Sequence, residues 1–317
     1  VGSIGTIEIY DGEKTITSIN TTPESLDIQK NLNEMIKNNC KYCVMEVSSH
    51  ALVLNRIDNI DYEAAVFTNL TQDHLDFHKT LENYKNAKEK LFYKTKSINI
   101  FNIDDKVGEE FFNKSLNRDI KTYTYGVEKE ADFKAANIKL YDDRTEYDLI
   151  IDKQKYKVST PILGNFNVYN TLAAITTCIL LGLSREDVIK RVQNLKSVSG
   201  RLDKVENDKN VNIIVDYAHT PDALLNILKS ARLFTKNRII LVFGCGGNRD
   251  KAKRPIMGKI AQQNADISII TSDNPRFEKE MDIIEYILCG IDKTLDNYFV
   301  VQDREDSIKK AIELYEV

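Results

Sequence analysis

One short stretch, TNLTQDHLDFHKTLENYKNAKEKLF at residues 68–92, holds two histidines, two aspartates and a lysine-rich helical pattern. His74 and Asp76 lie just beyond the apolar run AAVFTN, where a strand is expected to end and where ligands commonly bind. Two histidines raise the question of zinc. Zinc sites usually show cysteine partners or a histidine pair on one helix, whereas a loop-like segment separates His74 from His78. The pattern does not favour zinc, and we expect His78 at the surface.

The helix expected over residues 81–93 carries a lysine on its apolar side. Leu81, Tyr84, Lys88 and Leu91 are spaced by three and four residues, so they share one face. A lysine on a buried face is rare unless its charge is paired. The alternative is a side chain whose stem covers apolar surface while its amine reaches water. Spacing alone leaves both interpretations open.

Two segments carry residues that are typical of helix starts. TTPESLDIQ (21–29) has Thr22 before Pro23, and HTPDALL (219–225) has Thr220 before Pro221. In each, a capping hydroxyl precedes a proline at the first helical position. One interpretation is simple capping. The other is that the exposed N–H groups and hydroxyls receive an anionic ligand.

The segment FGCGGNRDKAKRP (243–255) combines glycines with basic residues between an expected strand and an expected helix. Glycines allow the backbone to approach a ligand closely. Four cationic side chains, Arg249, Lys251, Lys253 and Arg254, could face phosphate oxygens. The spacing matches neither of the standard glycine-rich phosphate motifs. Phosphate binding and a plain tight turn therefore both remain open.

These motifs need strands and helices to position them. Apolar runs predict strands at 42–47, 64–69, 97–102, 211–216, 238–243 and 266–271. Helical spacing predicts helices at 23–38, 81–93, 165–182, 221–234, 254–263 and 279–290. Such alternation predicts an α/β fold with parallel sheets and helices on both faces. The residues at the strand ends, Glu46, Asn69, Asp216, Gly244 and Asp273, are polar or glycine, so we expect ligand sites there.

Two further patterns divide the chain. Residues 136–160 alternate with period two around turn residues at 142–145, which predicts an antiparallel hairpin insertion. The polar segment KSVSGR (196–201) lies between the two strand–helix series. We therefore expect two domains, at 1–198 and 199–317, as a length of 317 residues also favours.

Composition excludes several classes of protein. The net charge of −4 and the lack of a basic patch argue against a nucleic-acid partner. The longest apolar run, 179–183, is too short to cross a membrane. Five cysteines without a secretory signal indicate reduced thiols in a cytoplasm. Cys40 and Cys43 form a C-x-x-C without a second pair, so we expect small buried side chains rather than a metal site.

A series of segments appears in the order found in the Mur ligases: TTPESLDIQ, MEVSSHAL, FTNLTQDHLDFH, YKNAKEKLF, GNFNVYN, GR (200–201), DYAHTPDAL, FGCGGNRDKAKRP and SDNPR. The chain resembles that family over nearly its whole length, and most of all the members that add the third amino acid. The resemblance implies a central mononucleotide-binding domain of the phosphate-loop type and a Rossmann-like C-terminal domain. It also implies a cytoplasmic, monomeric enzyme of peptidoglycan synthesis. Such an enzyme uses ATP to form an acyl phosphate on UDP-N-acetylmuramoyl-L-alanyl-D-glutamate, and the amine of meso-diaminopimelate then attacks it.

The resemblance also assigns roles to single residues. It implies that Lys88 is carbamylated, that Glu46, His74 and Lys88 hold Mg²⁺, and that Lys88 and His219 are catalytic. The remaining roles are binding roles: Thr21, Thr22, Ser48 and Arg56 for the UDP-muramyl peptide, Asn167, Asn170, Arg201 and Asp216 for the nucleotide, and Arg249, Asp273, Asn274 and Arg276 for the amino acid. The arginine of DNPR resembles the diaminopimelate-adding members. Its guanidinium would attract the second carboxylate of diaminopimelate and repel the amine of lysine.

Some family features are missing from the sequence. The glycine-rich phosphate loop is expected just before Val1 and a GKGHE-like segment after Val317, and GEKT (12–15) is not that loop. We therefore expect an interior part of a longer enzyme, with both domains truncated and no ligation by this chain alone. Two alternatives stay open. One is a folylpolyglutamate synthetase, which TTPESLDIQ and DNPR disfavour and which binding of a folate would reveal. The other is a non-catalytic nucleotide-binding module, which the intact motifs disfavour.

Overall fold

The computed structural model describes residues 1–141, 143–196, 198–208, 211–235 and 237–315. The chain divides into two compact units. The first consists of Val1–Leu70 and His78–Thr124, and the second of Thr71–Phe77 and Tyr125–Val317. Within the described ranges, every helix is too short or too polar to pass through a lipid bilayer.

A small mixed sheet opens the first unit, with strand order β3-β2-β1-β4. Its strands are β1 (Gly2–Ile4), β2 (Glu8–Tyr10), β3 (Thr15–Thr17) and β4 (Cys43–Met45). Only β1 and β4 run parallel, whereas β1, β2 and β3 form an antiparallel meander. The prediction of a buried strand at 42–47 is wrong in its burial, because β4 is an edge strand and its Cys43 and Val44 are exposed. An apolar run does not reveal which strand edges are paired.

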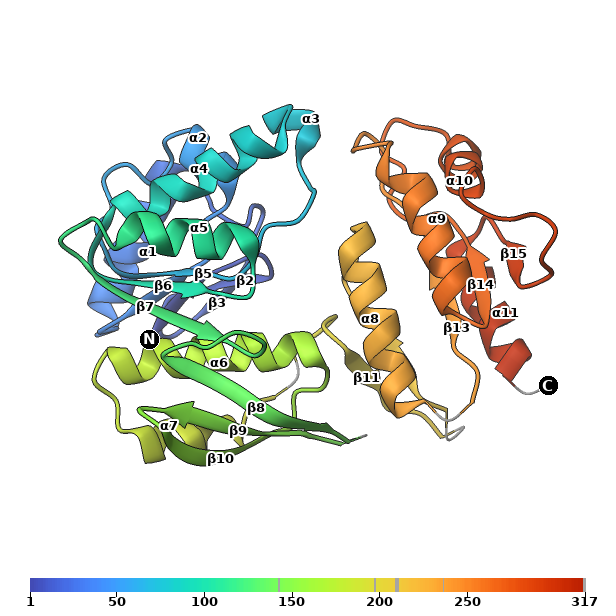
Figure 1. Ribbon diagram of the computed structural model, residues 1–317. Coiled ribbons are helices and arrows are strands. Elements are labelled where there is room, and N and C mark those ends of the chain that lie inside the picture. Colours follow the sequence, from blue (N-terminus) through green and yellow to red (C-terminus); the bar gives the residue numbers. More distant parts are fainter. Residues whose placement is uncertain (142, 197, 209–210, 236, 316–317) are drawn as a thin grey trace. The chain divides into compact units, whose positions relative to one another are not determined.

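The rest of the first unit is a strand–helix–strand layer. Its elements are α1 (Ser25–Lys37), α2 (Ser49–Val53), β5 (Tyr62–Phe67), α4 (Leu81–Tyr93), β6 (Thr95–Asn102) and α5 (Lys106–Ser115). Strands β5 and β6 are parallel, as predicted for 64–69 and 97–102. Both α4 and α5 cover the same face of these strands (Figure 1), where Phe67 packs edge-to-face on Phe92 and Phe111. This aromatic core fixes the helix that carries Lys88.

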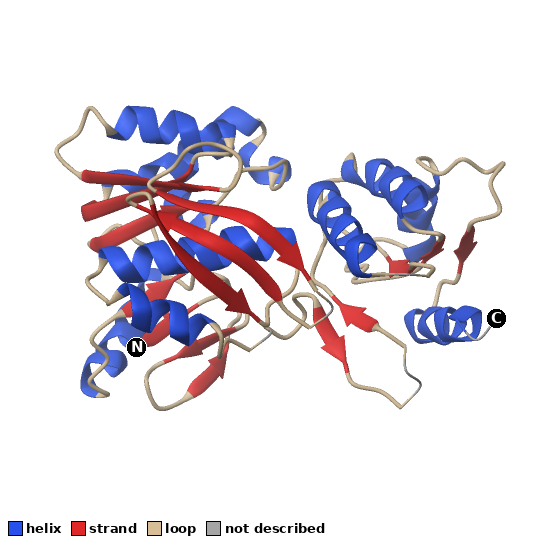
Figure 2. Cartoon of the chain, turned by 60° about the horizontal axis from the view of Figure 1, so that its bottom comes forward, coloured by secondary structure: helices blue, strands red, loops and turns tan. Residues whose placement is uncertain are grey.

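The second unit begins with a long antiparallel layer, seen as extended strands in Figure 2. Its strands are β8 (Phe133–Leu140), β9 (Thr145–Ile151) and β10 (Gln154–Thr160). The end of β7 (Lys121–Gly126) precedes them and pairs parallel with β8, and α6 (Asn165–Leu180) and α7 (Arg185–Val192) follow them. The antiparallel insertion is confirmed, but it has three strands rather than two. Of the predicted turn at 142–145, Asp142 lies outside the described residues and Thr145 already belongs to β9.

The C-terminal part holds a three-stranded parallel sheet of order β13-β14-β15. Its strands are β13 (Ile240–Phe243), β14 (Ile267–Ile270) and β15 (Tyr298–Val300), and its helices are α8 (Pro221–Phe234), α9 (Lys253–Asn264), α10 (Glu280–Leu288) and α11 (Arg304–Tyr315). The strand expected at 211–216 does not join this sheet. Instead β12 (Ile213–Val215) pairs antiparallel with β11 (Asp203–Val205) as a separate ribbon. The α/β class is therefore confirmed, with mixed rather than purely parallel sheets.

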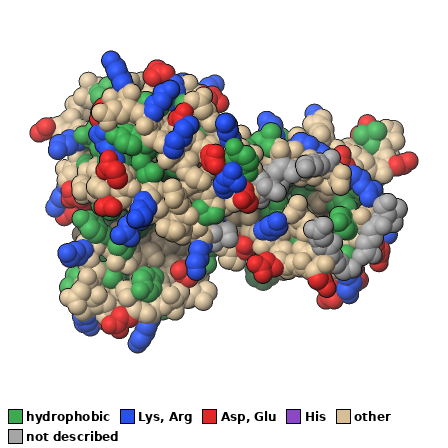
Figure 3. Space-filling view, turned by 90° about the horizontal axis from the view of Figure 1, so that it is seen from below, with side chains coloured by type: hydrophobic (Ala, Val, Ile, Leu, Met, Phe, Trp, Pro, Cys, Tyr) green, Lys and Arg blue, Asp and Glu red, His purple; other side chains and the backbone are tan. Residues whose placement is uncertain are grey.

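The surface carries charges of both signs. Figure 3 shows Lys and Arg side chains interspersed with Asp and Glu on the face it presents. This pattern fits a formal net charge of only −4 spread over 44 basic and 48 acidic residues.

Candidate functional site

Thr22 is the centre of a polar cluster beyond the carboxyl end of β4. Its hydroxyl donates to the Glu46 carbonyl (2.8 Å) and accepts the Ser48 N–H (2.9 Å). Arg56 donates from Nη1 to the Thr22 carbonyl at 2.9 Å. Of the two interpretations left open for Thr22, helix capping is wrong, because the N-cap residue of α1 is Glu24 and the helix starts only at Ser25. Thr22 is 1% exposed and instead holds the chain between β4 and α2 in place.

Thr6 completes this cluster and was not predicted from the sequence. Its hydroxyl donates to Glu46 Oε2 (2.5 Å) and lies 3.1 Å from the hydroxyl of Thr21. The strand-end rule explains its position: β1 and β4 are parallel with Ile4 opposite Met45, so Thr6 and Glu46 emerge at the same edge. Three residues form too short a strand to recognise from periodicity. The Glu46 side chain remains exposed and so is open to a ligand.

Ser48 and Arg56 are fixed at the start and beyond the end of the short helix α2. Ser48 is the N-cap residue of α2 and accepts the Ala51 N–H at 3.2 Å. Arg56 also forms an ion pair with Glu24 at 2.6 Å. The predicted residues for the UDP-muramyl peptide therefore share one connected network. Such a network presents hydroxyl and guanidinium donors, which suit phosphate or carboxylate oxygens.

His78 is buried, contrary to the prediction of a surface residue. It is 5% exposed, and its Nε2 lies 2.8 Å from the hydroxyl of Ser49 on α2. Its ring stacks on Tyr84 of α4 with centroids 4.9 Å apart. The error arose because Ser49 lies far from His78 in sequence, so local pattern gave no sign of a partner. The contact with Ser49 and the stack on Tyr84 together link α2 to α4.

Lys88 lies one turn after Tyr84 on α4, and its Nζ is 5.3 Å from the Tyr84 ring centroid. The side chain is half-buried, as a lysine on the inner side of the helix should be. Leu81, which was predicted on the same buried face, is exposed instead. The first turn of α4, which holds Leu81, lies beyond the apolar core that packs against the rest of the helix.

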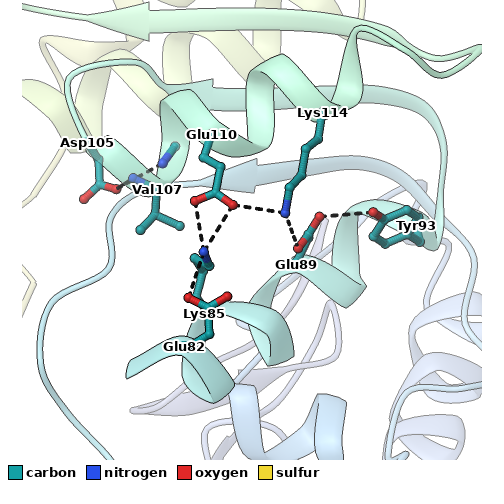
Figure 4. A network of polar contacts seen from close by, with 9 residues as sticks. Glu82, Lys85, Glu89, Tyr93, Asp105, Val107, Glu110 and Lys114 are labelled. Carbon is teal, nitrogen blue, oxygen red and sulfur yellow. Dashed lines mark hydrogen bonds and ion pairs between the residues drawn. The ribbon is translucent and has the colours of Figure 1, made fainter. Parts of the chain in front are cut away.

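A ladder of charges joins α4 to α5 (Figure 4). Lys85 contacts Glu82 (2.9 Å) and Glu110 (3.0 Å), Lys114 contacts Glu110 (3.0 Å) and Glu89 (3.1 Å), and Tyr93 donates to Glu89 at 3.0 Å. Hydrogen bonds to Glu82 and then to Glu110 raise the pKa of Lys85. Lys85 is therefore a lysine held as a cation, three residues before Lys88.

The predicted magnesium ligands come from both units, Glu46 and Lys88 from the first and His74 from the second. Within the described residues, no three His, Cys, Asp or Glu side chains are grouped so that they could hold a metal. Mg²⁺ typically takes one or two carboxylates and completes its shell with water and substrate phosphates. An exposed strand-end carboxylate such as Glu46 fits that kind of donor set. His74 has a backbone φ of 55°, and its N–H donates to Asp73 Oδ1 at 2.8 Å.

In the second unit, Asp73 lies between the two predicted site histidines. Its Oδ2 is 3.5 Å from Nε2 of His74 and 3.5 Å from Nε2 of His219. Burial acts to raise the pKa of Asp73, but the hydrogen bond from His219 and the charge of His74 outweigh it, so the pKa is lowered overall. His219 also places Nδ1 3.1 Å from the Tyr217 carbonyl. Asp73 was not among the predicted site residues, although it immediately precedes His74.

The predicted nucleotide-binding residues form two separate groups. Asp216 accepts the N–H groups of Leu202 and Ala218, each at 2.8 Å. The guanidinium of Arg201 lies over the Tyr217 ring, 4.6 Å from its centroid. On α6, Asn170 donates to Asn167 Oδ1 at 2.8 Å. Asp216 thus organises the segment after β12, and the two asparagines form a pair on one helix.

Two loops at the carboxyl ends of β13 and β14 are bound tightly to each other. The Gly247 N–H donates to the Asn274 carbonyl and Arg276 Nη1 donates to the Gly247 carbonyl, both at 2.8 Å. A Cβ on Gly247 would lie 1.9 Å from the Pro275 carbonyl oxygen, so only glycine fits. The glycine loop therefore does allow a close backbone approach, but the approach is to the DNPR loop.

Not all four basic residues of the glycine loop reach the surface, where they could have faced phosphate oxygens. Arg254 and Lys253 are buried, and Arg254 forms an ion pair with Glu278. Lys251 also pairs with Glu278, at 3.2 Å. Arg249, Asp273, Asn274 and Arg276 are exposed. A carboxylate ligand at this edge would therefore meet Arg276 or Arg249.

Comparisons with known proteins agree with this architecture. The family described as "Mur ligase middle domain" matches residues 1–178, and the one described as "Mur ligase, glutamate ligase domain" matches residues 200–316. The chain is 52% identical over 314 residues to a protein of Clostridioides difficile named UDP-N-acetylmuramoyl-L-alanyl-D-glutamate--2,6-diaminopimelate ligase, covering 99% of this chain and 65% of that relative. A protein of Clostridium botulinum with the same name is 49% identical, covering 99% and 64%. The chain thus spans about 65% of the length of these relatives.

Solved structures give the same picture. A structure of a UDP-N-acetylmuramoyl-L-alanyl-D-glutamate--2,6-diaminopimelate ligase is 33% identical with a TM-score of 0.67, covering 98% of this chain and 64% of that one. Folylpolyglutamate synthase of Mycobacterium tuberculosis, complexed with ADP, has a TM-score of 0.74 at 16% identity, covering 95% and 66%. At that identity the second likeness shows the fold alone. From the two matching domains and these relatives, the chain belongs to the Mur ligase family.

Proposed function

We propose that the protein carrying this chain is an ATP-dependent amide ligase of peptidoglycan synthesis, which adds meso-diaminopimelate to UDP-N-acetylmuramoyl-L-alanyl-D-glutamate in the cytoplasm. The observation that carries the proposal is the connected cluster beyond β1 and β4. There Thr21, Thr22, Glu46 and Arg56 join through hydrogen bonds of 2.5 to 3.1 Å by way of Thr6 and the backbone. The names of the relatives support the choice of substrates.

The reaction has two steps. A free carboxylate oxygen of the D-glutamyl residue attacks the γ-phosphorus of ATP, which forms an acyl phosphate and releases ADP. The amine of diaminopimelate then attacks the acyl carbon, phosphate leaves, and the nitrogen loses a proton. Both steps develop negative charge on oxygen, so cationic and hydrogen-bonding groups fixed around them lower the barrier.

In the first unit we assign direct contact with the UDP-muramyl peptide to Thr21, Ser48 and Arg56. Thr22 is 1% exposed and its hydroxyl is already engaged on both sides. Its part is therefore to position the chain that carries Ser48, rather than to touch the ligand.

In the second unit we assign nucleotide contacts to Asn167, Asn170, Arg201 and Asp216, and a catalytic role to His219. Nδ1 of His219 lies 3.1 Å from the Tyr217 carbonyl and Nε2 lies 3.5 Å from Asp73 Oδ2, so both ring nitrogens face an acceptor. The Asp73 carboxylate would stabilise the imidazolium form of that ring. The exposed residues Arg249, Asp273, Asn274 and Arg276 would receive the amino acid.

We assign Mg²⁺ to Glu46, His74 and a carbamylated Lys88, working as a set around the ATP phosphates. When bound, the ion would neutralise phosphate charge and polarise the transferred group. The support is chemical: a carbamate would turn a half-buried cation into an oxygen ligand, and Glu46 is an exposed carboxylate at a strand end.

We keep the division into a central domain at 1–198 and a C-terminal domain at 199–317, with one protomer as the working unit. The two family matches, 1–178 and 200–316, support a boundary in this region. Arg276 at the end of the DNPR sequence supports diaminopimelate over lysine, because only diaminopimelate offers a carboxylate at its far end.

The experiment is a ligation assay with the intact protein that carries this chain. ADP release should require ATP, the UDP-muramyl dipeptide and meso-diaminopimelate together, and mass spectrometry should show the amide product. ADP release that is independent of the muramyl substrate, or equal use of a folate acceptor, would overturn the proposal.

A further inference from the structure

Glu278 connects the glycine loop to the DNPR loop through one carboxylate. It accepts from Arg254 Nη2 at 2.8 Å and Nη1 at 3.0 Å, and from the Asn248 N–H at 2.5 Å. Lys251 adds an ion pair at 3.2 Å. Arg254 is 0% exposed and also reaches the Gly246 carbonyl at 3.4 Å. A buried, two-point ion pair of this kind fixes direction as well as distance.

The same two loops are tied a second time on either side of Arg276. The Phe277 N–H donates to Asn248 Oδ1 at 3.0 Å, and Arg276 itself donates to the Gly247 carbonyl at 2.8 Å. Arg276 and Asn248 both have a backbone φ of 51°, in the left-handed region that residues other than glycine rarely adopt. Such a conformation persists only where the surroundings hold it. The contacts made by Asn248 and Glu278 keep the backbone at Arg276 in this conformation.

Glu278 also determines which cationic side chains near these two loops are already paired with a carboxylate. Arg254 and Lys251 are both engaged by its carboxylate, and Arg254 is closed off from solvent. Arg276, by contrast, is exposed and donates a single Nη to the described residues of the chain. A guanidinium has five N–H donors in a fixed fork, so a face of Arg276 remains for a carboxylate.

We propose that Glu278 is a positioning and specificity-determining residue for the amino-acid acceptor. By binding Arg254, Lys251 and the Asn248 N–H, it holds Arg276 in the orientation that takes the distal carboxylate of the acceptor. It also prevents Arg254 and Lys251 from offering that carboxylate a second, wrongly placed partner. This inference rests on the proposed function and adds a named determinant of its substrate choice.

The consequence is a change in acceptor binding without a change in ATP use. Loss of the Glu278 charge would release Arg254 and Lys251, and Arg276 would no longer be fixed. Small displacements of a positioning group reduce productive binding steeply. We expect the KM for meso-diaminopimelate to rise about tenfold or more, and the preference for it over L-lysine to fall by a similar factor. The KM for ATP should stay within about twofold of the unmodified value, because no assigned nucleotide residue contacts Glu278.

The test uses the intact protein with ATP and muramyl dipeptide saturating and the acceptor varied. Glu278→Gln keeps the shape and removes the charge. Asp266→Asn is the matched control, since Asp266 also accepts one arginine (Arg232, 2.7 Å) and one backbone N–H (Ile239, 2.7 Å) in the same part of the chain. Asp266→Asn should leave both KM values unchanged.

A second variant covers the case in which Glu278→Gln does not fold, as judged by circular dichroism. Asn248→Gly removes the contact to the Phe277 N–H, leaves no buried charge unpaired, and tolerates a φ of 51°. It should raise the acceptor KM in the same direction. If the unmodified protein ligates diaminopimelate and a folded Glu278→Gln or Asn248→Gly keeps its KM and acceptor preference, this inference is wrong and the proposed function stands. If the unmodified protein does not ligate diaminopimelate, the proposed function itself fails.

Discussion

Replacing Arg254 by methionine tests whether the buried ion pair holds the C-terminal loops together. Arg254 is 0% exposed and makes two contacts of 2.8 and 3.0 Å with Glu278, so Arg254→Met keeps much of the packing volume and removes the charge. Breaking a buried pair from one side typically costs about 3–5 kcal/mol. Glu278 would keep Lys251 at 3.2 Å, and its side chain is 14% exposed. We therefore expect a loss at the lower end, about 3 kcal/mol.

The same pair gives stability a pH dependence of known sign. The hydrogen bond from Arg254 is the largest cause that lowers the pKa of Glu278, from 4.5 to about 2. Because the folded pKa lies below the unfolded one, the contribution is present above about pH 4.5 and is lost as the pH falls toward 2. The full shift corresponds to roughly 3 kcal/mol, which we reduce to about 2 kcal/mol because the carboxylate is partly solvated. In Arg254→Met this pH-dependent part should largely disappear.

The assay is urea unfolding at pH 7 and at pH 3, followed by far-UV circular dichroism because the chain has no tryptophan. The double variant Arg254→Met/Glu278→Leu serves as the control, since replacing both charges by apolar groups should recover much of the lost stability. A loss below about 1 kcal/mol for Arg254→Met at pH 7, or an unchanged pH dependence, would refute the reasoning.

Three further predictions concern single side chains. In the intact protein, Lys88→Ala should lower the ligation rate by about a hundredfold or more, with partial rescue by short carboxylic acids, whereas Lys85→Ala should stay within about tenfold because it removes only ladder contacts; equal losses in kinetic assays would contradict the assignment. Thr220→Ala should cost about 1 kcal/mol in urea unfolding, since the hydroxyl of Thr220 accepts the Ala223 N–H at 3.3 Å, and no measurable loss would argue against that cap. Arg276→Ala should reduce the preference for meso-diaminopimelate over L-lysine by about tenfold or more in competition assays, and an unchanged preference would show that another residue selects the acceptor.

Features fixed by local chemistry were predictable from the sequence. The helix at 221–234 was found with its cap because Thr220 and Pro221 act within their own turn. The helix at 81–93 and the strands around Phe67 and Phe101 were found because their apolar spacing is long and regular.

Features fixed by distant partners were not predictable. Thr22 has the same local pattern as Thr220, but its hydroxyl binds Glu46 and Ser48, more than twenty residues away, and so does not cap α1. His78 looked like a surface residue because its partner Ser49 lies 29 residues earlier. The segment 211–216 has the composition of a parallel strand, yet β12 pairs antiparallel with β11. Composition indicates that a strand forms but not which neighbour it takes.

Residues of the candidate site were likewise predictable only where a local rule identified them. Glu46 followed from the rule that ligands bind beyond the carboxyl ends of parallel strands, and β4 does end just before it. Thr6 obeys the same rule but was missed, because β1 has only three residues and shows no periodicity. The role of Glu278 was invisible in the sequence, because its partners Asn248 and Arg254 come from another loop and helix.

The measurement that tests the central claim most directly follows an oxygen atom. The UDP-muramyl dipeptide is prepared with ¹⁸O in the D-glutamyl side-chain carboxylate and ligated to meso-diaminopimelate by the intact protein with unlabelled ATP. If the carboxylate attacks ATP to form an acyl phosphate, each turnover must transfer one ¹⁸O atom to the released phosphate, which mass spectrometry detects. Phosphate without ¹⁸O alongside the amide product would contradict the acyl-phosphate route.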